Sequence, residues 1–290
     1  MDLCDINQIK ALLARHGFRF SKSMGQNFLI ADWVPKEIAK ASYACAEVGV
    51  LEVGPGIGCL TRELAKRART TVAVELDRSL LPILEETLAD YGEDVSVISG
   101  DILKMDIPQL VNQHLSPYFE FVACGNLPYN ITTPVITALI ESDCFFAITV
   151  MVQKEVAQRI CAQPGGKDYG AFSVYCQYYT RPKILFEVPP ECFIPAPKVT
   201  SAVVQMIHRP GYDREEITDD PDHFFQVVRA AFALRRKTLL NSLSAGLGGQ
   251  YVKEDITRAI AACGLPADIR GERLSIPQFA QLSQALRGLL

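Results

Sequence analysis

The chain has 290 residues, enough for one large or two modest domains. Its formal net charge of −4 argues against a protein that coats nucleic acid without sequence preference, but it is compatible with an enzyme that has a local basic patch. No apolar run approaches the roughly 18 residues of a membrane helix, and the N-terminus lacks the basic-then-apolar order of a signal peptide. The nine cysteines include no C-x-x-C pair and the four histidines are scattered, so we expect a cytoplasmic protein without disulfides or a metal site.

The first 45 residues predict an amphipathic helix, a loop and a second helix. After them, short apolar strands alternate with helical patterns as far as about residue 154. We expect strands at 48–51, 70–74, 95–98, 121–124 and 144–152, and helices at 59–67, 80–91 and 133–141. This alternation predicts an α/β fold with a mostly parallel sheet and helices on both faces.

The later part of the chain first turns β-rich and then helical. We expect β-rich stretches at 173–188 and 199–208, an extended proline-containing segment at 193–198, a linker at 213–222, and helices at 223–243, 253–263 and 277–290. The pattern predicts a first domain of residues 1–209, with residues 1–45 as its helical and loop extension, and a smaller all-helical domain of residues 210–290.

A glycine-rich segment, Glu52-Val53-Gly54-Pro55-Gly56-Ile57-Gly58, follows the first expected strand and precedes a helix. Strand, glycine loop and helix together form the unit that brings backbone close to a nucleotide-like ligand. A dinucleotide-binding G-x-G-x-x-G motif would require glycine at position 59, where the chain has Cys59. The observed G-x-G-x-G spacing with a leading acid is typical of S-adenosylmethionine sites.

The next two expected strands also end in carboxylates. Glu75 follows Gly54 by about 20 positions, which suits a group that accepts both ribose hydroxyls of a nucleotide. Asp101 follows the strand at 95–98, where its carboxylate can accept from an adenine amine. A helix cap or a turn is the alternative role for Asp101. Three polar strand ends in this order favour a methyltransferase cofactor site.

The strand at 121–124 leads into Asn126-Leu127-Pro128-Tyr129. The exocyclic amine of a base is a poor nucleophile, and an Asn side-chain oxygen together with a backbone carbonyl can accept its two N–H groups. Proline removes a backbone donor, and the aromatic ring offers a face on which a base can stack. Alone, N-x-P-Y is equally compatible with a strand-end turn and a core tyrosine; its position after the glycine loop favours amine methylation.

Two short stretches carry basic residues without an intervening acid. The first contains Arg15, Arg19 and Lys22, and the second, from Arg229 to Lys237, contains Arg229, Arg235, Arg236 and Lys237. Clusters of this size are commonly solvated helix faces, and contact with RNA phosphates is the functional alternative.

Taken in order, these motifs resemble the small-subunit (16S) ribosomal RNA adenine dimethyltransferase family, whose bacterial members set kasugamycin sensitivity. The resemblance covers nearly the whole chain and rests on Gly25–Leu29, Glu52–Gly58, Glu75, Asp101, Asn126–Tyr129, Phe193–Val204 and Arg235–Leu243. The antibiotic-resistance methyltransferases of large-subunit RNA share the early motifs, but they are less similar in Ser201–Val204 and Arg235–Leu243. The family implies a Rossmann-like class I methyltransferase sheet followed by a C-terminal helical domain that contacts RNA or the ribosome.

The resemblance also implies the reaction: two methyl groups pass from S-adenosylmethionine to each of two adjacent adenosines near the 3′ end of small-subunit RNA. It implies cofactor contacts as follows: Asn27 and Leu29 close over the cofactor, Gly54 and Gly56 line its amino-acid portion, Glu75 holds the ribose, Asp101 holds the adenine, and Asn126 lies between cofactor and target. The substrate would be RNA in an immature 30S particle, and we expect a monomer with a role in subunit biogenesis.

For the target base, the resemblance implies that Asn126 and the carbonyl of Leu127 or Pro128 orient the amine. Tyr129 would stack on the base and Phe193 would cover its other side. Three alternatives remain open at this point: a nucleotide-dependent oxidoreductase on a similar sheet, an assembly factor whose catalysis is incidental, and a related methyltransferase that acts on a different RNA adenine.

Overall fold

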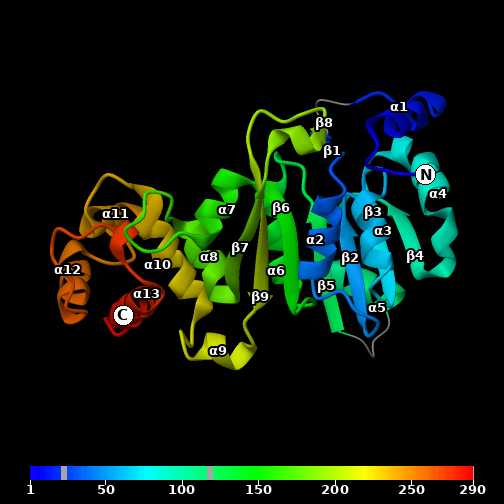
Figure 1. The fold of residues 1–290 in the computed structure, drawn as a ribbon. Coiled ribbons are helices and arrows are strands. Elements are labelled where there is room, and N and C mark those ends of the chain that lie inside the picture. Colours follow the sequence, from blue (N-terminus) through cyan, green and yellow to red (C-terminus); the bar gives the residue numbers. More distant parts are fainter. Residues whose placement is uncertain (21–24, 116–119, 290) are drawn as a thin grey trace. The chain divides into compact units, whose positions relative to one another are not determined.

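The structure is a computed structural model, and it describes residues 1–20, 25–115 and 120–289 (Figure 1). The chain divides into two compact units. The first combines Met1–Ala157 with Lys183–His208, and the second combines Gln158–Pro182 with Arg209–Leu290. Within the described ranges, no helix has both the length and the apolar character needed to cross a membrane.

A seven-stranded sheet organises the first unit. Its order is β4-β3-β2-β5-β6-β9-β7, with bounds β2 (Val48–Val53), β3 (Thr70–Glu75), β4 (Val95–Ser99), β5 (Glu120–Asn126), β6 (Ala147–Gln153), β7 (Thr180–Val188) and β9 (Ser201–His208). The five strands from β4 to β6 run parallel, and β9 pairs with β6 in the antiparallel sense. Because β3 and β5 flank β2 on opposite sides, the strand order reverses at β2, the position where such sheets bind ligands.

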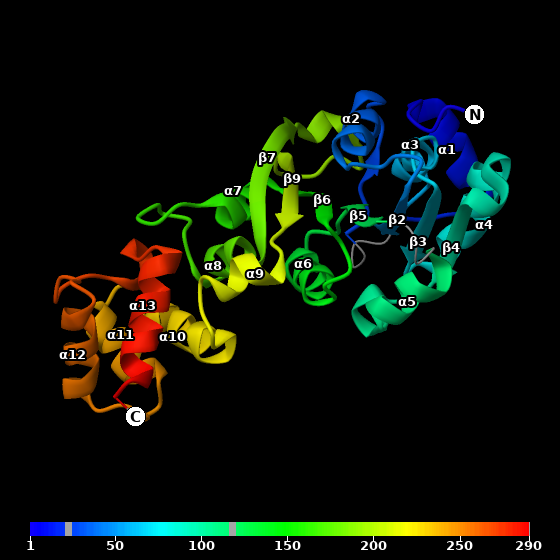
Figure 2. The same cartoon turned by 90° about the horizontal axis from the view of Figure 1, so that it is seen from below.

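The parallel strands confirm the expected α/β fold. All six residues of β2 are buried, as are five of the six in β3, because helices cover both faces of the sheet. In Figure 2, α2 (Trp33–Ala41) and α3 (Cys59–Ala65) lie over one face of the sheet, and α5 (Ile107–His114) and α6 (Thr132–Glu141) lie over the other. Each expected strand from 48 to 124 is present and extends one or two residues further than its apolar run.

The N-terminal segment adds a small element that the sequence pattern did not predict. After α1 (Ile6–Arg15), the two-residue strand β1 (Phe28–Leu29) pairs antiparallel with β8 (Phe193–Ile194). This pairing ties residues before the main sheet to the proline-containing segment after β7. The helix α4 (Leu81–Leu88) is shorter than the expected 80–91, whereas α6 agrees closely with the expected 133–141.

The β-rich stretch expected at 173–188 is wrong in its first half. Helix α8 (Ala171–Tyr179) precedes β7, and it follows α7 (Lys154–Cys161), which was not expected either. Aromatic residues favour strands in general, but here Tyr175 and Tyr179 lie one helical turn apart and both contact the Phe225 ring. Tertiary packing has overridden local propensity.

Helices from two parts of the chain build the second unit. They are α8, α9 (Gly211–Glu215), α10 (Pro221–Ala233), α11 (Leu239–Gly246), α12 (Lys253–Ala262) and α13 (Ile276–Arg287). The single helix expected at 223–243 is two helices, because Thr238 caps a new one by accepting a hydrogen bond from the Asn241 N–H. The expected linker at 213–222 includes part of α9.

The division into units differs from the expected boundary after residue 209. Residues 158–182 belong with the C-terminal helices. The physical reason is their aromatic content: Tyr169, Val174 and Tyr178 are buried in one apolar cluster with Phe224 and Phe279. That cluster is the core of the second unit.

Candidate active site

The glycine loop after β2 adopts a backbone that side chains disfavour. Gly54, Gly56 and Gly58 have φ values of 72°, 61° and 92°. A Cβ atom on Gly56 would lie 3.3 Å from the Phe28 ring, and one on Gly58 would lie 3.1 Å from Leu88. The loop therefore packs closely against Phe28 and Leu88. Its residues from Gly54 to Ile57 line a pocket.

Glu75 ends β3 at the rim of this pocket, where it is only 6% exposed. Its carboxylate accepts hydrogen bonds from the backbone N–H of Asp77 at 2.8 Å and of Gly56 at 3.3 Å. Burial raises the pKa of Glu75, and these two hydrogen bonds partly offset the effect. The carboxylate is thereby fixed against the glycine loop.

Asp101 follows β4 and lines the same pocket. It also caps a short 3-10 helix: Oδ1 accepts from the Leu103 N–H at 3.1 Å, and Oδ2 lies 3.5 Å from Lys104 Nζ. Asp101 therefore has the capping role that was the alternative interpretation of the sequence, and it also lines the pocket, as expected of a ligand contact.

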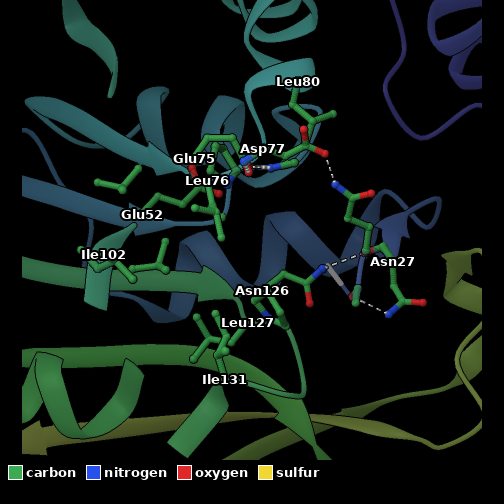
Figure 3. Close-up of a pocket in the computed structure, with 18 of the residues that line it drawn as sticks. Asn27, Glu52, Glu75, Leu76, Asp77, Leu80, Ile102, Asn126, Leu127 and Ile131 are labelled. Atoms are coloured by element: carbon green, nitrogen blue, oxygen red, sulfur yellow. Dashed lines mark hydrogen bonds between the residues drawn. The ribbon is translucent and has the colours of Figure 1, made fainter. Parts of the chain in front are cut away.

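The turn at the end of β5 faces the pocket from the opposite side (Figure 3). Asn126 Nδ2 donates to the carbonyl of Asn27 at 3.0 Å, which fixes the orientation of the amide. The Asn126 side-chain oxygen consequently points away from Asn27, and within the described ranges no donor bonds to it. The Asn27 side chain in turn donates to the Gly25 carbonyl at 3.1 Å, so the N-terminal loop and the turn are linked.

The two neighbouring carbonyls of the turn differ in their hydrogen bonding. The Pro128 carbonyl accepts from the Ile131 N–H at 3.2 Å and from Thr132 Oγ1 at 3.1 Å, so both of its lone pairs are used. The Leu127 N–H donates to the Met151 carbonyl, but no donor among the described residues reaches the Leu127 carbonyl. The sequence left open whether the Leu127 or the Pro128 carbonyl accepts from a ligand. In the structure, the Leu127 carbonyl is the one that remains available.

Tyr129 also lines the pocket, and its hydroxyl lies 2.6 Å from Ser201 Oγ at the start of β9. Burial raises the pKa of Tyr129, and the Ser201 hydrogen bond acts in the opposite direction. The ring is thereby anchored at its polar end while remaining partly exposed.

Phe193 does not line the pocket, unlike the other expected residues of the site. It is 3% exposed and belongs to the apolar core of the first unit, because β8 pairs with β1 and turns this side chain inward. The remaining expected contacts all line the one pocket: Asn27, Leu29, Gly54, Gly56, Glu75, Asp101, Asn126, Leu127, Pro128 and Tyr129.

The basic clusters are only partly available for RNA. Arg15 pairs with Glu86, Arg19 is exposed, and Lys22 lies outside the described residues. Arg235 bonds to Glu272 and to the carbonyls of residues 167 and 169, so it holds the second unit together. Arg236 and Lys237 are exposed, and no ion-pair partner for either occurs in the part of the chain that the structure describes.

Sequence reasoning assigned no role to several residues of the site. Leu76 and Ile102 line the pocket directly after Glu75 and Asp101, and Leu76 is 47% exposed, unusual for leucine. An apolar residue behind each strand-end acid is a signal that could have identified them. Ser201 carried no such signal, because its contact with Tyr129 joins residues 72 positions apart.

Two solved structures have a similar fold over most of the chain. The 23S rRNA methyltransferase ErmE is 25% identical with a TM-score of 0.66, covering 90% of this chain and 99% of that one. A dimethyladenosine transferase from Plasmodium falciparum is 24% identical with a TM-score of 0.71, covering 88% and 95%. Together with the strand order and the glycine loop, they define a Rossmann-like methyltransferase fold.

The sequence comparisons narrow this class to a family. The profile of the ribosomal RNA adenine dimethylase family matches residues 17–274. The ribosomal RNA small subunit methyltransferase A of Streptococcus pneumoniae (strain JJA) is 44% identical over 290 residues, covering 99% of both chains. The chain belongs to the ribosomal RNA adenine dimethylase family.

Proposed function

We propose that this protein transfers methyl groups from S-adenosylmethionine to the N6 amines of two adjacent adenosines near the 3′ end of small-subunit ribosomal RNA, giving dimethyladenosine. The observation that carries the proposal is a shared pocket: the glycine loop, Glu75 and Asp101 line it together with the turn from Asn126 to Tyr129. Family membership and the 44% identity to a small-subunit enzyme support the choice of RNA.

The residues present fit the cofactor. The Gly54–Ile57 backbone would hold the amino-acid portion, the Glu75 carboxylate would accept from the ribose hydroxyls, and Asp101 would accept from the adenine amine. Leu76 and Ile102 supply apolar surface for the adenine ring. Asn27 and Leu29 close the pocket from the N-terminal loop.

The Asn126 side-chain oxygen and the Leu127 carbonyl would accept the two N–H groups of the target amine. The Asn126 amide is oriented by its hydrogen bond to the Asn27 carbonyl, and the Leu127 backbone is held by its N–H bond to the Met151 carbonyl on β6. Neither acceptor oxygen has a donor among the described residues. Acceptance of the N–H groups turns the nitrogen lone pair away from the ring and toward the methyl group. Tyr129, held by Ser201, would stack on the everted base.

When bound, S-adenosylmethionine supplies an electrophilic methyl group with its leaving group already attached. The protein therefore needs no strong base before the attack, and its contribution is to align amine, methyl and sulfur. Such alignment can contribute about 7–11 kcal/mol. Removing the base from its stack costs a few kcal/mol, and less in an RNA loop than in a duplex.

We place the substrate in an immature 30S particle in the cytoplasm and take the protein to act as a monomer in subunit biogenesis. Arg19, Arg236 and Lys237 are exposed members of the basic clusters for which no ion-pair partner occurs among the described residues, and they would meet RNA phosphates. With a net charge of −4, the chain relies on such local contacts and not on a general attraction to RNA.

The test is methyl transfer from labelled cofactor to immature small subunits, with the modified nucleoside identified. We expect dimethyladenosine from the wild-type protein. Asn126→Ala removes one acceptor for the amine, so its rate should fall by on the order of a hundredfold. An exposed control, Asn7→Ala, should retain full activity. A methylated cytosine, a methylated protein, or an unchanged rate in Asn126→Ala would refute the proposal.

A further inference from the structure

Glu52 is a buried carboxylic acid that none of the roles above uses. It is the fifth residue of β2 and lines the same pocket as Glu75 and Asn126 (Figure 3). It is 1% exposed, and neither of its oxygens has a hydrogen-bond partner among the described residues. An unpaired buried charge is costly, so an acid in this position requires either a proton or a cationic partner.

Among the described residues, the elements around Glu52 offer it no cationic partner. Its register neighbours are Ala73 on β3 and Cys124 on β5. The Thr61 hydroxyl on α3 is close enough to lower the pKa of Glu52, but it does not form a hydrogen bond with the carboxyl group. Arg62 is engaged elsewhere, donating to the carbonyls of Thr87 and Met1.

The pocket as a whole is acidic. Among the described residues, its lining has four carboxylates and neither lysine, arginine nor histidine: Glu52, Glu75, Asp77 and Asp101. Asp77 accepts from Gln26 Nε2 at 2.6 Å and Glu75 from two backbone N–H groups, so those two are hydrogen-bonded. Of the four carboxylates, only Glu52 is both fully buried and without a hydrogen-bond partner among the described residues.

Burial raises the pKa of Glu52 to about 8, and the nearby Glu75 acts in the same direction. Without a ligand, the carboxyl is therefore mostly neutral at pH 7. A cation placed beside it favours the charged form and lowers the pKa, so the proton leaves.

We propose, on the basis of the function proposed above, that Glu52 is the counter-ion of a cationic group of the methyl donor and releases its proton to solvent when that group binds. The O–H bond of the carboxylic acid breaks, the proton passes to water or buffer, and the carboxylate pairs with the cation. S-adenosylmethionine carries two such groups, a sulfonium and an ammonium, whereas its product S-adenosylhomocysteine retains only the ammonium. Glu52 thereby couples cofactor binding to pH.

The coupling predicts how affinity responds to pH. Only the deprotonated fraction of Glu52 is competent to pair, so apparent cofactor affinity should rise by roughly tenfold between pH 7 and pH 9, for a pKa of about 8. The cofactor's own amine also titrates, and its effect on the pH dependence of affinity is the same for the wild type and Glu52→Gln. Comparing the two proteins therefore isolates the effect of Glu52. The variant resembles the neutral acid in shape, so it should fold.

The decisive measurement is calorimetric titration of the full-length protein with S-adenosylmethionine at pH 7, in two buffers with different ionisation enthalpies. We expect release of most of one proton per cofactor from the wild-type protein and from Glu47→Gln, an exposed acid before the same strand. Glu52→Gln should bind the cofactor more weakly and lose this release. Release with S-adenosylhomocysteine as well would assign the ammonium as the partner, and release with S-adenosylmethionine alone would assign the sulfonium.

Two outcomes would overturn the assignment: cofactor binding without proton release, or the same release from Glu52→Gln as from the wild type. Neither affects the proposed function, which fails instead if the wild-type protein binds no cofactor. If Glu52→Gln binds too weakly to titrate, thermal unfolding without cofactor decides. The wild type should lose stability relative to the variant between pH 6 and pH 9, and parallel curves would refute a titrating Glu52.

Discussion

At the scale of single residues, the site depends on groups whose hydrogen bonds are already allocated before a substrate arrives. The Asn126 side-chain N–H donates to the Asn27 carbonyl, and the side-chain oxygen stays available to a ligand. The Tyr129 hydroxyl is hydrogen-bonded to Ser201, and the face of its ring stays available for stacking. Each side chain is held at one end and offers the other. Such preorganisation means that the residues behind the site affect the rate without touching the base.

The Tyr129–Ser201 pair provides a test at this scale. Tyr129→Phe keeps the ring but loses a hydrogen bond worth about 1 kcal/mol, so kcat/KM should fall roughly fivefold. Ser201→Ala should produce a similar loss, and the double variant should be no worse than either single one, because both changes remove the same contact. Tyr129→Ala should be far more damaging, since it also removes stacking worth about 1–3 kcal/mol. Additive losses in the double variant would show that the two residues act separately.

At the scale of elements, the turns carry as much of the function as the strands that precede them. Gly56 combines φ of 61° with a close approach to Phe28, whereas Gly92 has φ of 53° and nothing within 4 Å of its added Cβ. An added side chain would strain the backbone at both positions, but only at Gly56 would it also disturb packing against Phe28.

Substituting each glycine by alanine makes use of this difference. Both variants should lose stability, on the order of 1 kcal/mol or more, because alanine disfavours the positive φ at each position. Gly56→Ala should in addition displace the loop from Phe28 and weaken cofactor binding by at least tenfold, while Gly92→Ala should bind normally. Thermal unfolding and calorimetric titration would measure the two effects. Equal cofactor affinity in the two variants would contradict the assigned role of the loop.

Elements that are recognisable from a short stretch of sequence were predicted correctly. Elements that depend on contacts with distant residues were missed. The strands β2, β3, β4 and β5 were recognisable because each is an apolar run that ends in a polar or glycine-rich turn. Helix α8 was missed because its aromatics favour strands until Phe225 and its neighbours pack against them. Phe193 was expected beside the base, but a two-residue strand pairing with β1, invisible in the sequence, turns it into the core.

At the scale of the whole molecule, each unit contains a buried titratable group, and the two respond to pH in opposite directions. In the second unit, His223 lies between the Ser283 hydroxyl at 2.7 Å and the Tyr251 hydroxyl at 2.9 Å, and burial lowers its pKa. In the first unit, burial raises the pKa of Glu52 to about 8. Neutral forms are thus favoured in both cores.

The His223 group predicts acid sensitivity of the second unit. Because its folded-state pKa is below the usual 6.5, its contribution to stability is present above pH 6.5 and is lost as the pH falls below that value. His223→Gln should be less stable at pH 7.5, with a flatter dependence between pH 7 and pH 5. Thermal unfolding across this range would show it, and parallel curves for the two proteins would contradict it.

Glu52 has the opposite sign. Its folded-state pKa exceeds the unfolded value of 4.5, so its contribution to stability is complete below pH 4.5 and disappears as the pH rises through about 8. Taken alone and without cofactor, these two groups favour the folded state most in mildly acidic conditions.

The saturated carbonyl of Pro128 has a consequence for how this enzyme can vary. Thr132 is 2% exposed in the first turn of α6, yet its hydroxyl helps to keep the Pro128 carbonyl occupied. In the proposed mechanism, only the neighbouring Leu127 carbonyl would then accept from the target amine. A chain that exchanged Thr132 for valine would present two rival acceptors side by side, and an adenine could settle against the wrong one. Fidelity of methylation would then be lost through a residue that never meets the RNA.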